Sequence, residues 1–167
     1  MEEDYKRQID NRLEQLCKGM GQALWEVQGV EQLLAKYYAI VFELSDNPSL
    51  EEIDEAFENN FVYTAGRLVN KLKTSSRESS IDQSLLDTFV KERNWLAHKI
   101  RRLDFTSLYD EVKFIELIDR VIAIEQESSK LIDIFHNLMI EYFVSIGVPR
   151  DYIDKIIKQE LSRLYGS

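Results

Sequence analysis

Arg93 and His98 are the side chains of this sequence whose types and spacing best suit chemistry at a phosphate. An arginine keeps its positive charge in proteins, whereas a histidine gains or loses a proton near neutral pH. The pair therefore combines a fixed cation that binds phosphate with a group that transfers protons. Asn94 follows the arginine and can orient either partner by hydrogen bonding. RNA is the first substrate to consider, and this chemistry requires neither a metal ion nor another cofactor.

More cations surround this pair, although the whole chain carries a formal net charge of −9. Glu92 is the only acid in the segment from residue 91 to residue 102. An acidic protein does not coat nucleic acid broadly, but a local basic cluster can hold a few phosphates. The alternative is a solvated helix end whose cations complement the helix dipole. We expect substrate-binding side chains at Lys91, Trp95, Lys99, Arg101 and Arg102. We expect the other tryptophan, Trp25, to pack between helices.

The length and composition indicate a single domain covering residues 1–167. A lone Cys17 cannot form an internal disulfide, and the acidic start of the chain does not resemble a secretion signal. The longest apolar run, from Tyr37 to Phe42, is far too short for a membrane span. The sequence therefore predicts a soluble protein of the reducing cytoplasm that makes no contact with a membrane.

Apolar residues spaced by threes and fours predict one long amphipathic helix through the first forty-odd residues. The glycines between Gly19 and Gly29 predict a kink or a close helix contact there. Ser49 and Glu52 have the spacing of a capping box and begin a second helix, which we expect to break near Asn59-Asn60.

Three further helices complete the prediction. The third is capped by Ser79 or Ser80 and runs to about Leu103, and the fourth runs from Asp104 or Thr106 to about Ile146. Gly147 and Pro149 end it, and a short final helix follows. The predicted fold is an all-α, up-and-down bundle of four or five helices. The fourth helix should present a wide apolar face: Val112, Ile115, Ile118, Val121, Ile122, Leu131, Ile134, Phe135, Leu138, Tyr142, Phe143 and Ile146.

Arg93 falls within the apolar stripe of the third helix, formed by Leu85, Phe89, Leu96, Ile100 and Leu103. A core position rarely accepts a guanidinium unless the group is paired or lines a cleft. His98 lies on roughly the opposite side of a straight helix. Three explanations remain open: Arg93 pairs with a buried acid, the helix end is distorted, or both residues line a groove completed by a second copy of the chain.

The arrangement Arg93-Asn94-x-x-x-His98, near the end of the third helix of a small all-α bundle, resembles the motif of the HEPN superfamily. The resemblance implies a homodimer whose interface forms a metal-independent ribonuclease site, often in a toxin, antiviral or RNA-processing setting. Carried over by position, Arg93, Asn94 and His98 would be the catalytic residues, and an antitoxin or other protein would be a partner. The toxin branch usually has tyrosine two residues after the histidine, where this chain has Ile100.

Two other functions remain open. The chain could be a noncatalytic helical module that dimerises or binds RNA or a nucleotide, with His98 an ordinary exposed residue. It could also be a magnesium-dependent all-α nucleotide pyrophosphatase, because carboxylates three residues apart share a helix face. The relevant pairs are Glu52 with Glu55 and Glu116 with Asp119. About sixty residues separate the two pairs, which favours solvated helix faces over a metal site.

Overall fold

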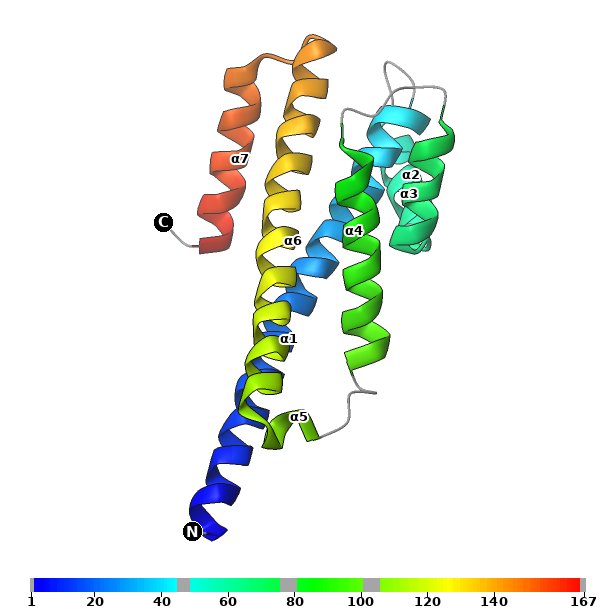
Figure 1. The fold of residues 1–167 in the computed structure, drawn as a ribbon. Helices are drawn as coiled ribbons and strands as arrows, with labels where there is room; N and C mark the ends of the chain where they lie inside the picture. The colour runs from blue at the N-terminus through cyan, green and yellow to red at the C-terminus, as the bar shows by residue number, and fades with distance from the viewer. Residues whose placement is uncertain (1, 45–48, 76–80, 101–105, 166–167) are drawn as a thin grey trace.

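The computed structural model describes residues 2–44, 49–75, 81–100 and 106–165, and within these ranges it contains helices and no strand. The protein is therefore all-α, as the sequence predicts, but the described residues form seven α-helices and not the predicted four or five. Two α-helices end in a π turn, labelled η. The elements in chain order are α1 (Glu2–Tyr38), η1 (Ala39–Glu43), α2 (Leu50–Phe61), α3 (Ala65–Thr74), α4 (Gln83–Asn94), η2 (Trp95–Lys99), α5 (Thr106–Tyr109), α6 (Glu111–Ser145) and α7 (Arg150–Tyr165) (Figure 1).

The two long helices α1 and α6 form the centre of the protein and run in the same direction (Figure 1). Their direction also follows from two close approaches, because Gly19 lies against Val121 and Gly29 lies against Ile132. Buried residues of both helices are spaced alternately by three and four, the pattern of helices that pack along a shared seam. On α1 these residues are Ala23, Val27, Val30, Leu34 and Tyr37, and on α6 they are Phe114, Leu117, Val121, Ile124, Ser128, Leu131 and Phe135.

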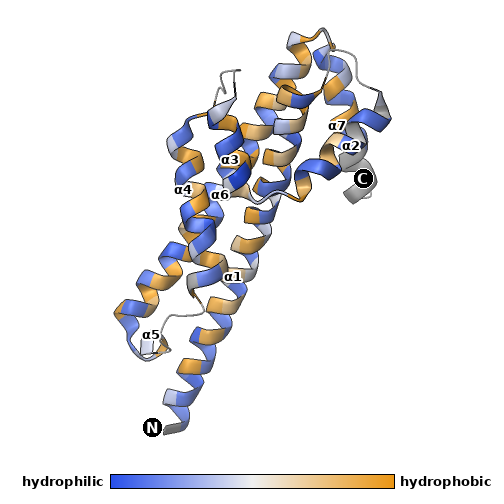
Figure 2. Cartoon of the chain, turned by 90° about the vertical axis from the view of Figure 1, so that its right-hand side faces the viewer, coloured by the Kyte–Doolittle hydropathy of each residue, from blue (hydrophilic) through white to orange (hydrophobic). Residues whose placement is uncertain are grey.

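The shorter helices are arranged around this seam. α4 runs back along one side of α6, α7 runs back along the other, and α2 and α3 lie at the end where α1 finishes (Figure 1). Hydrophobic and hydrophilic residues alternate along the helices (Figure 2), as expected where each helix buries one side. Because of this alternation, none of the described helices is apolar enough over its length to span a membrane.

The structure confirms several predicted boundaries. Ser49 and Glu52 form the predicted capping box: Glu52 donates its backbone N–H to the serine hydroxyl, and its carboxylate accepts from Ser49. These hydrogen bonds lower the pKa of the Glu52 carboxyl. The predicted close helix contact is present at Gly29, and Gly147 ends α6 with a φ of 94°. The final helix is also present as α7.

Other boundaries differ from the prediction. Asp82 caps α4 by accepting the Ser84 backbone N–H at 2.8 Å, so the prediction of a Ser79 or Ser80 cap was wrong. The predicted break near Asn59-Asn60 follows Phe61 instead. The predicted fourth helix is divided, because Asp110 caps α6 after the short helix α5. The predicted helix limits at Leu103 and Asp104 lie outside the described residues.

The predicted apolar face of α6 is correct at Val121, Leu131 and Phe135, which are buried, but it is wrong at other positions. Four of its residues are largely exposed, namely Val112, Ile115, Ile122 and Ile146. The buried side instead includes Phe114, Leu117 and Ile124, which the prediction omitted. The reason is that α6 is apolar over most of its circumference, so that its sequence does not identify the side that meets α1.

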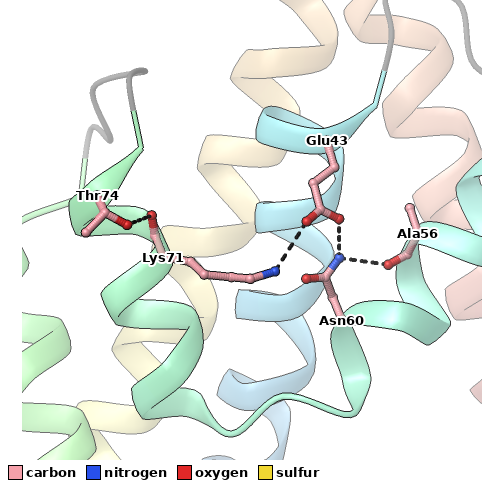
Figure 3. A network of polar contacts seen from close by, with 5 residues as sticks. All are labelled: Glu43, Ala56, Asn60, Lys71 and Thr74. Atoms are coloured by element: carbon pink, nitrogen blue, oxygen red, sulfur yellow. Dashed lines mark hydrogen bonds and ion pairs between the residues drawn. The ribbon is translucent and has the colours of Figure 1, made fainter.

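A polar network holds α2 and α3 against the end of α1 (Figure 3). The buried Asn60 donates through Nδ2 to Glu43 Oε2 at 2.6 Å and to the Ala56 carbonyl at 2.9 Å. The other oxygen of Glu43 accepts from Lys71 Nζ at 3.4 Å. The same ammonium lies 4.0 Å from the centre of the Tyr63 ring. This network joins η1, α2 and α3.

We predict that Asn60→Ala lowers the free energy of unfolding by about 1–3 kcal/mol, because it removes the two hydrogen bonds that this buried side chain donates to Glu43 and to the Ala56 carbonyl. Asn59→Ala is the matched control, since Asn59 is exposed on the same helix and should change stability by less than about 0.5 kcal/mol. Urea unfolding followed by circular dichroism measures both values. Equal stabilities of the two variants would show that the Asn60 network does not stabilise the fold.

We also predict opposite effects at two glycines of α1. A Cβ at Gly29 would meet Ile132 Cδ1 at 3.0 Å, so Gly29→Val should destabilise by about 1–3 kcal/mol through overpacking. Nothing lies within 4 Å of a Cβ at Gly21, so Gly21→Ala should stabilise by about 0.5–1 kcal/mol through helix propensity. Thermal unfolding measures both changes. A neutral Gly29→Val would contradict the close α1–α6 contact.

Candidate functional site

The predicted motif lies where α4 ends and the π turn η2 begins. The Ile100 backbone N–H donates to the Trp95 carbonyl, which joins residues five apart rather than four. The turn therefore contains one residue more than an α-helical turn. Residues that follow it are rotated backwards about the helix axis relative to their positions on a straight α-helix. On a straight helix Arg93 and His98 would point about 140° apart. A π turn has more residues per turn than an α-helix, so each of its residues advances by less than 100° and this angle becomes smaller.

Arg93 is half-buried and paired with an acid from another helix. Its Nε donates to Glu31 Oε1 of α1 at 2.8 Å, and its Nη1 donates to Asn94 Oδ1 at 3.2 Å. The ion pair explains why a guanidinium is tolerated in the apolar stripe of α4. Two of the three explanations for Arg93 are therefore present together, since the residue is paired and the helix end is distorted. The chain by itself does not contain the third, a groove shared with a second copy.

His98 is exposed on η2 and forms no hydrogen bond or ion pair with any described residue. Asn94 is also exposed, but its side chain bonds Arg93 rather than the histidine. The structure therefore brings Arg93 and Asn94 together and leaves the imidazole facing solvent. Within one chain, His98 has no described side chain that would hold its ring in one orientation.

Trp95 packs inside the protein with an exposed fraction of 9%. The guanidinium of Arg120 from α6 covers its ring, with Cζ 3.8 Å from the ring centre. Arg120 also donates to both carboxylate oxygens of Glu92, at 2.8 and 3.2 Å. Trp95, which we expected to bind substrate, is therefore buried. Trp25 is 75% exposed on α1, so the prediction that it packs between helices was wrong.

Two adjacent residues of α4 carry opposite charges and form ion pairs with different long helices. Glu92 binds Arg120 of α6, and Arg93 binds Glu31 of α1. Each pair is a charge-assisted hydrogen bond between side chains that are only partly exposed. Such bonds are strong and directional, so they help to fix the orientation of α4. Together they set the rotation of α4 between the two long helices.

Little of the predicted basic cluster lies within the described residues. Lys91 is exposed on α4. The backbone of Lys99 ends η2, but its side chain is not among the described ones, and Arg101 and Arg102 lie outside the described residues. Arg93 is neutralised in part by Glu31. Lys91 and Arg93 are therefore the cations of the cluster whose positions the structure gives.

A pocket of about 570 Å³ opens beside Arg93. It lies between α1 and the segment that joins α2 to α3, and its lining is mixed, with polar, aromatic and charged side chains. The residues around it are Gln28, Glu31, Gln32, Ala35, Phe61, Val62, Tyr63, Thr64 and Arg93. Gln28, Glu31 and Gln32 were not among the predicted site residues. Their signal was a polar strip, at spacings of three and four, beside the apolar stripe of α1.

The carboxylate pairs of the pyrophosphatase alternative do not form one site in a single chain. Glu52 caps α2, which lies at the opposite end of the bundle from the start of α6, where Glu116 and Asp119 lie (Figure 1). Among the described side chains there is no group of three or more His, Cys, Asp or Glu placed to share a metal ion. Magnesium-dependent chemistry has no assembled ligand set in these parts of the chain.

Comparison with known proteins does not assign this site. No family model matches the chain, and the comparisons with curated proteins and with solved structures found no match.

Proposed function

We propose that this protein is a metal-independent endoribonuclease of HEPN type that acts as a homodimer. In this proposal His98 is the general acid or base, Arg93 binds the phosphate, and Asn94 orients the guanidinium through the hydrogen bond that it already accepts. The exposed Lys91 contributes to phosphate binding, together with Lys99, Arg101 and Arg102. The protein would act in the cytoplasm, in a toxin, defence or RNA-processing role, with an antitoxin or another protein as partner.

The observation that carries the proposal is the π turn η2. π turns inside α-helices are rare and occur frequently at functional sites. Here the turn begins two residues after Arg93 and includes His98. In this proposal the turn lowers the angle between these two side chains about the helix axis. The turn keeps Trp95 and Ile100 buried while His98 is exposed, so in this proposal it serves both packing and the site.

Cleavage would follow the usual route for a 2′-hydroxyl nucleophile. One His98 removes the proton of the 2′-hydroxyl as its oxygen attacks phosphorus, and the 5′-oxygen leaves with a proton from the partner's His98. The products are a 2′,3′-cyclic phosphate and a 5′-hydroxyl. Arg93 stabilises the charge that grows on the phosphate oxygens. Trp95 supports this site from within the protein by packing against Arg120.

A dimer supplies what one chain lacks. A general base must lie within hydrogen-bond reach of the proton that it removes, and its ring must be held in place. The described part of one chain holds Arg93 firmly through Glu31 but gives His98 no partner. Two copies of α4 that lie side by side would bring each exposed His98 and Asn94 to the arginine of the other copy.

A noncatalytic helical module is the second candidate function. The observation that favours it is the Arg93–Glu31 ion pair, which gives the arginine a structural role, together with an unpartnered, exposed His98. Under this reading the chain dimerises or binds RNA or a nucleotide without cleaving it. The two candidates differ in whether loss of His98 changes any activity.

We predict that His98→Ala lowers the rate of RNA cleavage by about 10²- to 10⁴-fold, the usual contribution of a general acid or base. The assay uses purified protein with single-stranded and structured RNA in excess chelator. His136→Ala is the matched control, because His136 is the other histidine and is also exposed. Equal cleavage by all three proteins, or none by any of them, would reject the nuclease and favour the noncatalytic module.

We predict that Glu31→Gln lowers KM for RNA by about two- to fivefold, since it removes one negative charge close to the bound phosphate. The kcat should change little, because the side-chain amide oxygen of the variant still accepts a hydrogen bond from Arg93. Glu14→Gln makes the same charge change at an exposed position of α1 and should leave KM unchanged. Steady-state kinetics separates the two constants. An unchanged KM in Glu31→Gln would show that Arg93 does not bind the phosphate.

A further inference from the structure

The pocket beside Arg93 lies next to the proposed catalytic residues and has no role in the chemistry described so far. Its volume of about 570 Å³ falls in the range of small-molecule and cofactor sites. Arg93 stands at one edge, while the rest of the lining comes from α1 and from the α2–α3 connection. The pocket therefore has a phosphate-binding group at its rim and a separate interior that can hold another part of the same substrate.

The interior combines hydrogen-bonding groups with aromatic rings. Gln28 and Gln32 are exposed amides on one side of α1, and each can donate and accept. Phe61 provides a ring on the facing side and is 41% exposed, whereas the Tyr63 ring of the same segment is covered by Arg67 and Lys71. A flat ligand with polar edges, such as a nucleobase, uses both features, because its faces stack on rings and its edge bonds the amides.

The charges around the pocket favour a ligand with a phosphate on one side. Arg67 lies over the Tyr63 ring, with Cζ 4.2 Å from the ring centre, and Lys71 covers the same ring. Arg93 lies at the α4 edge and has N–H donors left after its bonds to Glu31 and Asn94. Because Lys71 pairs with Glu43, Arg67 and Arg93 are the cations that compensate for Glu31, the one carboxylate among the described lining residues.

Trp25 extends this surface along α1. It is 75% exposed and precedes Gln28 by three residues and Gln32 by seven, so the three side chains share one outward side of the helix. An exposed tryptophan costs free energy in water, because its large apolar surface stays hydrated. A stacking surface for a second base gives this residue a use that packing does not provide.

We propose that this pocket binds one unstacked nucleotide of single-stranded RNA, next to the phosphate held by Arg93, and that Trp25 stacks on the neighbouring base. The inference rests on the proposed ribonuclease function and adds the substrate class: unpaired RNA. A paired base cannot enter the pocket, since its edge is bonded and its faces are stacked. The amides and rings then bind the nucleotide that flanks the scissile bond.

The test measures binding in the His98→Ala background, which separates binding from cleavage. The probe is a fluorescein-labelled, single-stranded oligoribonucleotide of about twelve mixed nucleotides, titrated with protein in excess chelator and followed by anisotropy. We expect the Gln28→Ala/Gln32→Ala double variant to raise Kd about tenfold, and Trp25→Ala to do the same through lost stacking. All substituted side chains are exposed, so the fold should be retained, and circular dichroism melts check this.

The matched controls are exposed residues of similar types on other helices. Gln126→Ala on α6 and Tyr152→Ala on α7 should leave Kd within about twofold of the parent. A blunt duplex of the same length should compete at least about tenfold more weakly than the single strand. Unchanged Kd in the pocket variants, equal competition by the duplex, or no binding of the single strand would each overturn the pocket assignment.

The outcomes also separate this inference from the proposed function. If wild-type protein shows no His98-dependent cleavage but binding depends on Gln28, Gln32 and Trp25, the nucleotide pocket stands and the nuclease is rejected. If cleavage depends on His98 while the pocket variants bind and cleave as the parent does, the nuclease stands and the pocket is rejected.

Discussion

The parallel packing of α1 against α6 is the constraint on which the rest of the structure depends. Both helices bury residues at alternating spacings of three and four, and Gly29 lets their backbones approach at Ile132. Once this seam forms, α4 packs beside it and makes contacts with both long helices. The two charged pairs then complete the arrangement, because Glu31 on α1 and Arg120 on α6 bind adjacent residues of α4. The candidate site is thus a consequence of where the seam leaves these two side chains.

The π turn η2 connects the packing of α4 with its proposed chemistry. Trp95 and Ile100 are both buried and lie one π turn apart, so the turn keeps both apolar side chains inside while His98 between them is exposed. His98 is exposed for this reason, and Arg93 is fixed to α1 at the preceding turn. The pocket on the α1 side shares Glu31 and Arg93 with this arrangement. The Arg93–Glu31 ion pair therefore contributes to the packing of α4, to the proposed catalytic site and to the proposed nucleotide pocket.

Much of the fold was predictable because its signals are local. Apolar spacing identified the long helices, the Ser49–Glu52 box identified the start of α2, and Gly147 identified the end of α6, since each depends on a few neighbouring residues. The buried side of α6 was not predictable, because apolar residues occur around most of that helix and only α1 selects among them. The cap at Asp82 was missed for a related reason, as several nearby polar residues could each serve.

For the candidate site, the sequence by itself determined the residue types: a guanidinium, an amide and an imidazole near the end of one helix, with the guanidinium in an apolar stripe. Only the tertiary structure decided what surrounds them. It paired Arg93 with Glu31, 62 residues away, buried Trp95 under Arg120, and left Trp25 exposed beside the pocket. The physical reason is that side-chain chemistry is carried by each residue alone, whereas partners, pockets and helix distortions arise only when distant segments pack together.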